Sequence, residues 1–506
     1  MPVIFEGWEA VLKRVFVAPD PGRTRLRFAA RAVLGIGLAV VVCLLAGLSL
    51  AGAVTGGLAA LLALFTVTDP TVRGQAVTTA LLPAVGLPVL AAAAELHDHP
   101  VARDLTFLAV IGAGVYARRF GPRGHSLGVF AFMTFFVAQF LHAATGRLPE
   151  LYAAVLLSVL SAFAVRFGLW CYEAKLPPAP VPAPPAGTGL ARVTTRQAVQ
   201  ATAGAGFALV VGQLVSGQRW YWAVGATWWI FVNTASRGET LVRGFRRVLG
   251  TVIGIGLGPL IAALHGAALP TAALLAVCVF GIFYTAAVSY TWMMLWVTLL
   301  AELLYGLLGV LNPGLLALRL AETGVGALGA VLAVLFVLPV TTHTITDAWI
   351  QRALRCVHAC TAEAAARLAG STAADPARRV AELEQLLGRV RLSVAPLVHP
   401  LNPMLGRKRR ARQVLDLLDD CARETRGLVA VAADPEASHD ARLAAACWRV
   451  EAAVEALTGG EHPRLDIATE APAVEPALAH LHGLERALAE LATPLRTPSG
   501  SPLVGA

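Results

Sequence analysis

The segment GETLVRGFRRVLGT, which runs from Gly238 to Thr251, places three arginines within five residues directly before an apolar run. About 170 residues earlier the shorter segment DPTVRG, Asp69 to Gly74, stands at the same point of another long apolar pattern. The tripeptide Val-Arg-Gly occurs in both segments, at Val72 and at Val242. A membrane-spanning pattern that occurs twice, with arginine at the same point of each copy, predicts two related halves that together move a solute across a bilayer.

The composition places most of the chain in lipid. Of its 506 residues 57% are hydrophobic and 14% are charged, whereas soluble domains carry roughly a quarter charged residues. Apolar runs near the ~20-residue length of a transmembrane helix begin at twelve points. They are Ala29, Ala51, Val77, Leu105, Leu127, Tyr152, Ala198, Trp220, Val248, Pro270, Tyr290 and Leu320. The runs lack the period-two alternation of barrel strands, so we predict an all-α polytopic membrane protein with ten to twelve spans.

The net charge of +9 is distributed along the ends of these runs and does not form one basic domain, so we expect no nucleic-acid partner. Positive residues concentrate on one side of the predicted membrane, beginning with the cluster from Lys13 to Arg27, while the other side receives only Arg103, Arg147 and Arg219. The positive-inside rule then predicts a multi-pass protein of the inner or plasma membrane with both termini in the cytoplasm.

Four segments are expected along the chain. Residues 1–174 and 191–341 form two tandem repeats of about six transmembrane helices, and because each starts from a cytoplasmic arginine cluster the repeats should be parallel. Between them, residues 175–190 contain LPPAPVPAPPAG, a proline-rich cytoplasmic linker that cannot be helical. Residues 342–506 form a C-terminal soluble helical domain, since apolar residues recur there with a period of 3.6, as in Val380–Val394.

The second half carries a family resemblance. The segment from Tyr221 to Asn233, the basic segment with Gly254, Gly256 and Gly258, and RLAETGVG from Arg319 to Gly326 resemble the fusaric acid resistance protein-like (FUSC) family. The same pattern is similar to aromatic acid exporters and, more distantly, to plant aluminium-activated malate transporters. The resemblance covers about residues 190–342, and the first half has only the DPTVRG version without the paired arginines. It implies an efflux permease for small organic, often aromatic, acids, or an anion pathway.

The arginines are the first candidate substrate-binding residues. Arg243 and Arg247 share a helix face at a spacing of four, and an arginine fork binds a carboxylate through two hydrogen bonds. Arg246 lies between them, and Gly250 and Gly254 should let a neighbouring helix approach closely. The alternative is that these arginines are membrane anchors or contacts to lipid headgroups.

Aromatic residues and one amide complete the predicted substrate site. Trp222, Trp228 and Trp229 could stack on an aromatic substrate, and Asn233 ends the same segment. The alternative for such residues is a belt at the membrane interface, which is favoured for Trp220 and Tyr221.

Two carboxylates are candidates for proton coupling. Glu302 lies within the apolar run WVTLLAELLYGLL, where an ionisable group is costly and usually functional. Glu322 is a second candidate, although its spacing of three from Arg319 would also allow it simply to neutralise that arginine. Gln139 and His142 are a weaker polar pair near the outer surface.

No cofactor, metal site or enzymatic activity is expected. Cys356, His358 and Cys360 form the only Cys/His cluster, but on a helix His358 points away from the face that the cysteines share. There is no catalytic constellation and no ATP-binding motif. We therefore predict a permease that exports small organic, aromatic carboxylic acids by proton-coupled secondary transport. The alternatives are a passive organic-anion channel or a membrane scaffold protein without transport activity. Besides the organic anion and the lipid bilayer, the partner could be a second copy of the chain or another membrane or periplasmic protein.

Overall fold

The computed structural model describes residues 23–173, 189–232, 234, 237–264, 268–307, 309–339, 342–368, 371, 373–398, 405–433, 441–458 and 476–495. Within these residues the chain is all-helical, with seventeen α-helices and a few short 3-10 turns. It divides into two compact units. Unit 1 comprises Met1–Ala179, Ala186–Thr234 and Thr240–Pro339, and unit 2 comprises Pro180–Pro185, Ala235–Glu239 and Val340–Ala506.

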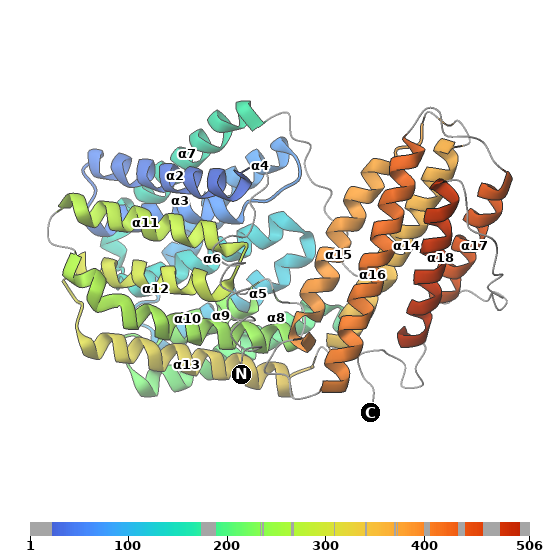
Figure 1. The fold of residues 1–506 in the computed structure, drawn as a ribbon. Coiled ribbons are helices and arrows are strands. Elements are labelled where there is room, and N and C mark those ends of the chain that lie inside the picture. The colour runs from blue at the N-terminus through green and yellow to red at the C-terminus, as the bar shows by residue number, and fades with distance from the viewer. Residues whose placement is uncertain are drawn as a thin grey trace. The chain divides into compact units, whose positions relative to one another are not determined.

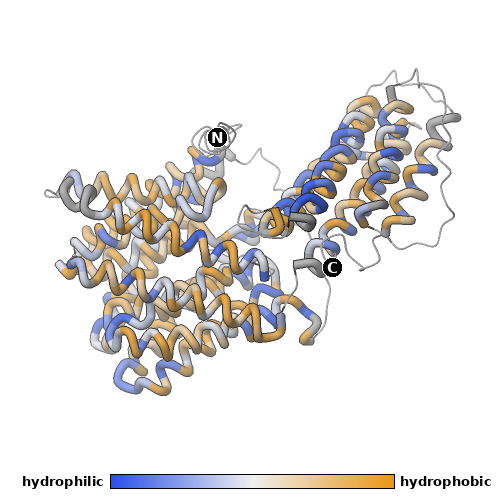
Figure 2. Tube along the Cα trace, turned by 60° about the horizontal axis from the view of Figure 1, so that its bottom comes forward, coloured by the Kyte–Doolittle hydropathy of each residue, from blue (hydrophilic) through white to orange (hydrophobic). Residues whose placement is uncertain are grey.

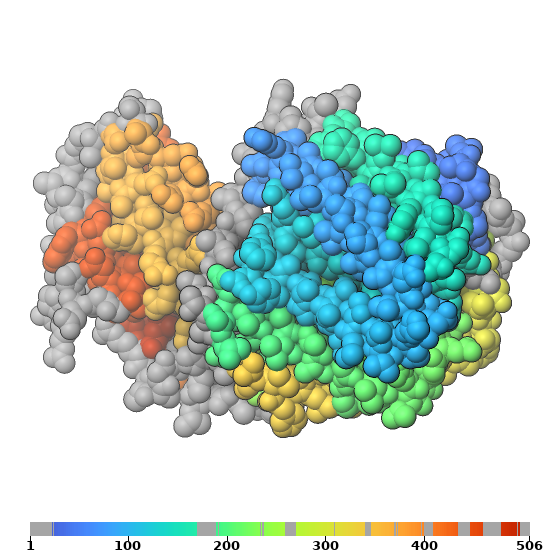
Figure 3. All heavy atoms as spheres, turned by 180° about the vertical axis from the view of Figure 1, so that it is seen from behind, coloured from blue at the N-terminus to red at the C-terminus, as the bar shows by residue number. Residues whose placement is uncertain are grey.

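Unit 1 contains the apolar helices (Figure 1). In the first half they are α2 (Thr24–Leu45), α3 (Leu50–Thr66), α4 (Val72–Glu95), α5 (Pro100–Ala117), α6 (Pro122–Phe140) and α7 (Leu148–Glu173). In the second half they are α8 (Val193–Val215), α9 (Tyr221–Phe231), α10 (Arg237–Leu264), α11 (Ala268–Ala286), α12 (Tyr290–Leu307) and α13 (Pro313–Phe336). Each of the twelve predicted apolar runs overlaps one of these helices. In Figure 3 the first-half segments form the upper part of the visible face of this unit and the second-half segments its lower part.

Seven helices within the described residues are long and apolar enough to cross a bilayer: α2, α4, α5, α7, α8, α12 and α13. Two shorter apolar helices, Leu50–Thr66 and Pro270–Ala286, accompany them. The protein is therefore a polytopic membrane protein, although seven is fewer than the ten to twelve spans expected. One reason is that α9, with 11 residues, is only about 16 Å long, about half of the ~30 Å hydrocarbon core.

Local sequence explains where several helices begin. Pro100, Pro122 and Pro313 each occupy the first turn of a helix, where the missing amide proton costs nothing. Thr71 accepts a hydrogen bond from Gly74 N at 3.0 Å, and Asn312 accepts one from Leu315 N at 2.8 Å.

Arginines from other parts of the chain cover the carbonyl ends of α3 and α9. Arg166 of α7 donates to the carbonyls of Ala63, Leu64 and Val67 at the end of α3. Arg118, which follows α5, donates to the Phe231 carbonyl at the end of α9 at 3.3 Å. Because the last carbonyls of a helix have no partner within it, these arginines let α3 and α9 end inside the protein.

The helix contacts of the first half recur in the second. α2 packs against α3 and α7 just as α8 packs against α9 and α13, and α5 packs against α6 just as α11 packs against α12. Contacts between the halves are reciprocal, since α5 packs against α8 and α11 packs against α2.

Unit 2 contains the amphipathic helices α14 (Thr342–Leu368), α15 (Pro376–Val398), α16 (Leu405–Ala432), α17 (Ala441–Thr458) and α18 (Pro476–Leu495). They enclose a core of their own, which includes Leu354, Val390, Leu418, Val450 and Leu484. Hydrophilic residues are denser along these helices than along those of unit 1 (Figure 2). The predicted linker 175–190 lies mostly outside the described residues.

Candidate functional site

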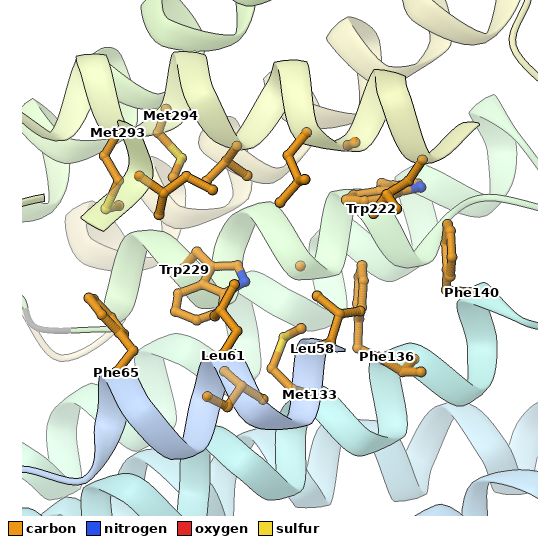
Figure 4. A pocket seen from close by; sticks show the side chains of 18 of the residues that line it. Leu58, Leu61, Phe65, Met133, Phe136, Phe140, Trp222, Trp229, Met293 and Met294 are labelled. Carbon is orange, nitrogen blue, oxygen red and sulfur yellow. The ribbon is translucent and has the colours of Figure 1, made fainter. Parts of the chain in front are cut away.

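A cavity lies inside unit 1 between α3, α6, α9 and α12 (Figure 4). Its volume open to water-sized molecules is about 170 Å³. The walls are almost entirely apolar and aromatic, and the charged side chains that line it are Arg247 and Arg319. The helix pairs α3/α9 and α6/α12 occupy matching places in the two halves, so most of the cavity wall comes from corresponding elements.

Helix α9 presents one face to this cavity. Trp222, Gly225 and Trp229 follow one another at spacings of three and four, so they share a face of the helix and line the cavity. Gly225 fits closely there: a Cβ atom would lie 2.8 Å from the Phe136 ring, so the ring would have to shift. Trp228 points the other way and stacks on Phe132 with ring centroids 4.4 Å apart, so it belongs to the core.

Arg243 and Arg247 meet at Tyr290, the first residue of α12. Arg247 is buried, and its Nη1 donates to the Tyr290 hydroxyl at 3.2 Å and to Met294 Sδ at 3.1 Å. The guanidinium of Arg243 lies over the Tyr290 ring, 4.1 Å from its centroid, and its Nε donates to the Trp229 carbonyl at 3.2 Å. Arg247 lines the cavity, and its Nε has no hydrogen-bond partner among the described residues. It can therefore still receive an acceptor.

The glycines of α10 place this arginine pair. A Cβ atom at Gly250 would lie 2.5 Å from the Thr291 carbonyl oxygen, and one at Gly254 would lie 2.6 Å from Thr298 Cβ. The close approach of a neighbouring helix that the glycines predicted is thus present, and the neighbour is α12. Arg246 is half-buried on another side of α10 and does not line the cavity.

Arg319 of α13 stands toward the other end of the cavity, near Trp222 and Tyr305. Its guanidinium lies 4.2 Å from the centroid of the Trp222 ring and 5.9 Å from that of Tyr305. Glu322 lies one turn later on α13 and is 0% exposed. Neither of its carboxyl oxygens has a hydrogen-bond partner among the described residues.

Glu302 lies on the opposite side of α12 from the cavity. It is buried, its Oε2 lies against Gly258 of α10, and its Oε1 has no hydrogen-bond partner among the described residues. Its neighbours Ala301 and Tyr305 line the cavity, but Glu302 does not.

A second, wider cavity of about 610 Å³ adjoins the first. It lies where α3, α9 and α11 end and where α2 and α6 begin, and Arg25 and His125 are among its lining residues. Phe65, Trp229 and Phe283 line both cavities, and the rings of Phe65 and Phe283 are 5.5 Å apart. These three residues, the aromatic constriction, separate the two spaces.

Several predicted residues lie elsewhere. The interface-belt interpretation of Trp220 and Tyr221 was wrong, because both are buried among the helices of unit 1. Gln139 is buried in α6 and His142 is exposed in the loop after it, so they do not form one site. Asn233 lies outside the described residues. Cys356 and Cys360 are buried in unit 2, and the described residues contain no group of three or more His, Cys, Asp or Glu that could hold a metal ion.

Sequence reasoning missed three residues that line the cavity and Tyr290, which contacts its arginines. Phe65, Phe283, Tyr290 and Tyr305 come from α3, α11 and α12 and have no spacing that relates them to one another. Only the repeat could have indicated where these residues lie, because α3 corresponds to α9 and α12 corresponds to α6.

Comparison with known proteins connects this site to a family. No curated protein matches the chain. Residues 207–360 match the family described as fusaric acid resistance protein-like. The match runs from within α8 into α14 and includes Trp222, Trp229, Arg247 and Arg319. The chain is thus a polytopic membrane protein that carries a fusaric acid resistance protein-like domain at residues 207–360.

Proposed function

We propose that the chain is a permease that exports small aromatic carboxylic acids through the cavity of unit 1 by proton-coupled secondary transport. The observation that carries this proposal is the cavity between α3, α6, α9 and α12, which combines aromatic walls with an arginine toward each end. A site of this kind accommodates an aromatic ring by burial and holds its carboxylate by charge-assisted hydrogen bonds. The domain at residues 207–360 is consistent with a transport role.

The two halves of unit 1 are proposed to be tandem repeats related by a twofold axis along the membrane normal. This is supported by the recurrence of the packing of α2, α3 and α7 in α8, α9 and α13, and by the reciprocal contacts of α5 with α8 and of α11 with α2. Transporters built from repeats commonly place the substrate at the repeat interface and alternate its access between the two sides.

The proposed route starts in the wider cavity, which we assign to the cytoplasmic side because α2 begins there. The substrate passes the aromatic constriction, binds Arg247 and Trp229, and moves toward Arg319 and Trp222. Arg243 positions Arg247 through their shared contact with Tyr290. Opening of the constriction requires ring rotation or helix movement, because Phe65 and Phe283 are in contact.

Glu322 and Glu302 are the proposed proton-coupling residues. Each carboxylate is buried among apolar helices and leaves at least one oxygen without a hydrogen bond among the described residues. An uncompensated charge is costly in such surroundings. When the substrate carboxylate binds Arg319, this arginine no longer compensates the negative charge of Glu322. Glu322 then takes up a proton, which removes the cost of an uncompensated buried charge. Glu302 offers a second carboxylate along α12.

The test is flux of benzoate in vesicles that contain the purified protein, with and without a pH gradient. Arg247→Gln should raise the benzoate concentration for half-maximal flux by about tenfold to a hundredfold, because a hydrogen bond between charged groups contributes about 1.5–3 kcal/mol. The matched control is Arg237→Gln, which removes the same charge from the exposed first residue of α10. Flux that does not respond to the pH gradient would indicate a passive channel, and absence of flux for every acid tried would indicate a scaffold protein.

A further inference from the structure

Ion pairs between the helices of unit 2 show in which direction each helix runs along the bundle. Arg379 Nε of α15 lies 2.7 Å from Glu363 Oε1 of α14, and Arg391 of α15 lies 2.5 Å from Asp419 of α16. The first pair joins the late part of α14 to the early part of α15, so these two helices are antiparallel. Arg391 with Asp419, and Arg426 with Glu384 at 3.3 Å, show that α15 and α16 are antiparallel as well. The first turn of α14, the last turn of α15 and the first turn of α16 therefore lie at one end of the bundle, the tether end.

The covalent chain keeps this end close to the bilayer. The candidate span α13 ends at Phe336 and α14 begins at Thr342, so five residues separate them. At most ~3.6 Å per residue, these five residues extend over roughly 18 Å. The covalent connection thus limits how far Thr342, the first residue of α14, can lie from the end of the last span.

The tether end carries the strongest run of positive charge in the chain. The sequence RKRRAR, Arg407 to Arg412, contains five Lys or Arg residues in six positions at the start of α16. Residues 385–415 hold seven Lys or Arg and no Asp or Glu. The remaining residues of 342–506 hold twelve Lys or Arg against twenty Asp or Glu. Within residues 342–506 the positive charge is therefore concentrated in one segment, and the remaining sequence is net acidic.

The folding of the bundle does not explain this run. Cations at the first turn of a helix are disfavoured by the positive end of the helix dipole. Arginines elsewhere in the bundle form ion pairs, such as Arg449 with Glu485 at 3.2 Å, but Lys408, Arg409 and Arg412 form none within the described part of the chain. Arg409 and Arg412 are also exposed. Their charge is thus available to an external partner.

We propose that the basic run Arg407–Arg412 binds the anionic phospholipid headgroups of the leaflet next to it and so docks the tether end of unit 2 on the membrane surface. A cluster of four or more Lys or Arg close to the end of a span is attracted to an anionic bilayer, and the attraction falls off within a Debye length. The tether is short enough to let the run come within that distance, and the complementary charge of the surface selects the orientation.

Hydrogen–deuterium exchange of the full-length protein in nanodiscs tests this docking. The peptide that covers residues 405–416 should exchange roughly tenfold more slowly in discs with phosphatidylglycerol than in discs of phosphatidylcholine alone. Raising the salt concentration to about 0.5 M should remove the difference. The variant R407Q/K408Q/R409Q/R412Q should exchange equally in both discs. The control R367Q/R378Q/R423Q/R486Q loses the same charge from exposed positions elsewhere in the bundle and should behave like the parent.

Three results would overturn the proposal. The first is equal exchange of this peptide in both discs for the parent protein, a comparison that needs no variant. The second is an equal loss of lipid dependence in the control, which would make net charge of the domain the cause. The third is that duplex DNA added to phosphatidylcholine discs slows the peptide as much as phosphatidylglycerol does, which would indicate a site for polyanions in general.

Discussion

The guanidinium carbon of Arg319 lies 4.2 Å from the centroid of the Trp222 ring, so a charge from α13 rests on an aromatic face that lines the cavity. Cation–π contacts of this kind are worth about 0.5–2 kcal/mol and are strongest where water is excluded. The contact holds Arg319 at the cavity wall, away from full pairing with Glu322. It also connects the two elements, α9 and α13, that pack against each other in this half.

Trp222 and Trp228 should therefore differ in the defect that their replacement causes. Trp222→Leu removes the surface under Arg319 and is expected to weaken benzoate binding several-fold, in line with the ~0.5–2 kcal/mol of the contact, with little change in thermal stability. Trp228→Leu removes the stack on Phe132 and is expected to lower stability by ~2 kcal/mol with a smaller effect on affinity. Flux and melting temperature measured on both variants separate the two roles, and identical defects would contradict them.

Replacement of either buried glutamate should uncouple transport from protons. We expect Glu322→Gln and Glu302→Gln to abolish benzoate flux driven by a pH gradient and to retain exchange of labelled for unlabelled benzoate, because an amide cannot take up or release the proton. Glu490→Gln, at an exposed position of α18, is the control. Gradient-driven flux at the parental rate in both buried variants would show that these carboxylates serve packing alone.

The contact between α10 and α12 predicts that alanine substitutions at Gly254 and Gly256 have different effects on stability. A Cβ atom at Gly254 would lie 2.6 Å from Thr298 Cβ, whereas one at Gly256 would meet no atom within 4 Å. Gly254→Ala should thus destabilise the protein by about 1–3 kcal/mol, the usual cost of overpacking, and Gly256→Ala should be neutral. Thermal unfolding in detergent, followed by loss of monodisperse protein, measures both. Equal stability of the two variants would mean that α10 and α12 are further apart.

Sequence reasoning predicted the helices well for a physical reason. In a bilayer each spanning segment must satisfy its own backbone, so apolar runs become helices with few competing outcomes. The run at Trp220 became α9 and the run at Val248 lies within α10. The number of long spans was less predictable, because Arg118 and Arg166 allow short helices to end inside the protein, and nothing in the local sequence reveals such a distant cap.

The site was predicted only in part, because a cavity is assembled from distant segments. Arg243 and Arg247 were related by helix spacing, and the structure brings them together at Tyr290. Trp222 and Trp228 looked alike in sequence, yet they point to opposite sides of α9. Helical periodicity cannot identify the side of α9 that lines the cavity, because apolar residues surround this helix on all sides. The spacing of Arg319 and Glu322 suggested an ion pair, but the Trp222 ring competes for the arginine.

Two thiols of unit 2, those of Cys421 and Cys447, should be unreactive in the folded protein. Burial raises the pKa of Cys421 to about 12, and it raises that of Cys447 to about 11. Because the thiolate is the nucleophile, both cysteines remain protonated and inert near neutral pH. Mass spectrometry after maleimide treatment should find them unmodified in the native protein and modified after denaturation. Rapid modification of Cys421 before denaturation would show that the bundle opens at α16.

The orientation of the chain can be tested at three positions with new cysteines. Positive residues concentrate on one predicted side of the membrane, so Ala186 and Ser438 should be cytoplasmic and Gly146, between α6 and α7, should be on the opposite side. An impermeant maleimide should label Gly146→Cys in intact cells. It should label Ala186→Cys and Ser438→Cys only after the membrane is opened.

The parent protein is the background control for this labelling, and six of its seven cysteines are buried: Cys43, Cys278, Cys356, Cys360, Cys421 and Cys447. Gly146 is exposed, and a side chain there meets no atom within 4 Å, so the substitution should not disturb α6 or α7. Both repeats start from an arginine cluster, and parallel repeats require these clusters to share one side of the membrane. Labelling of Ala186→Cys from outside intact cells would place the start of the second repeat opposite to the first. The repeats would then be inverted, and the twofold axis proposed for unit 1 would have to lie in the membrane plane.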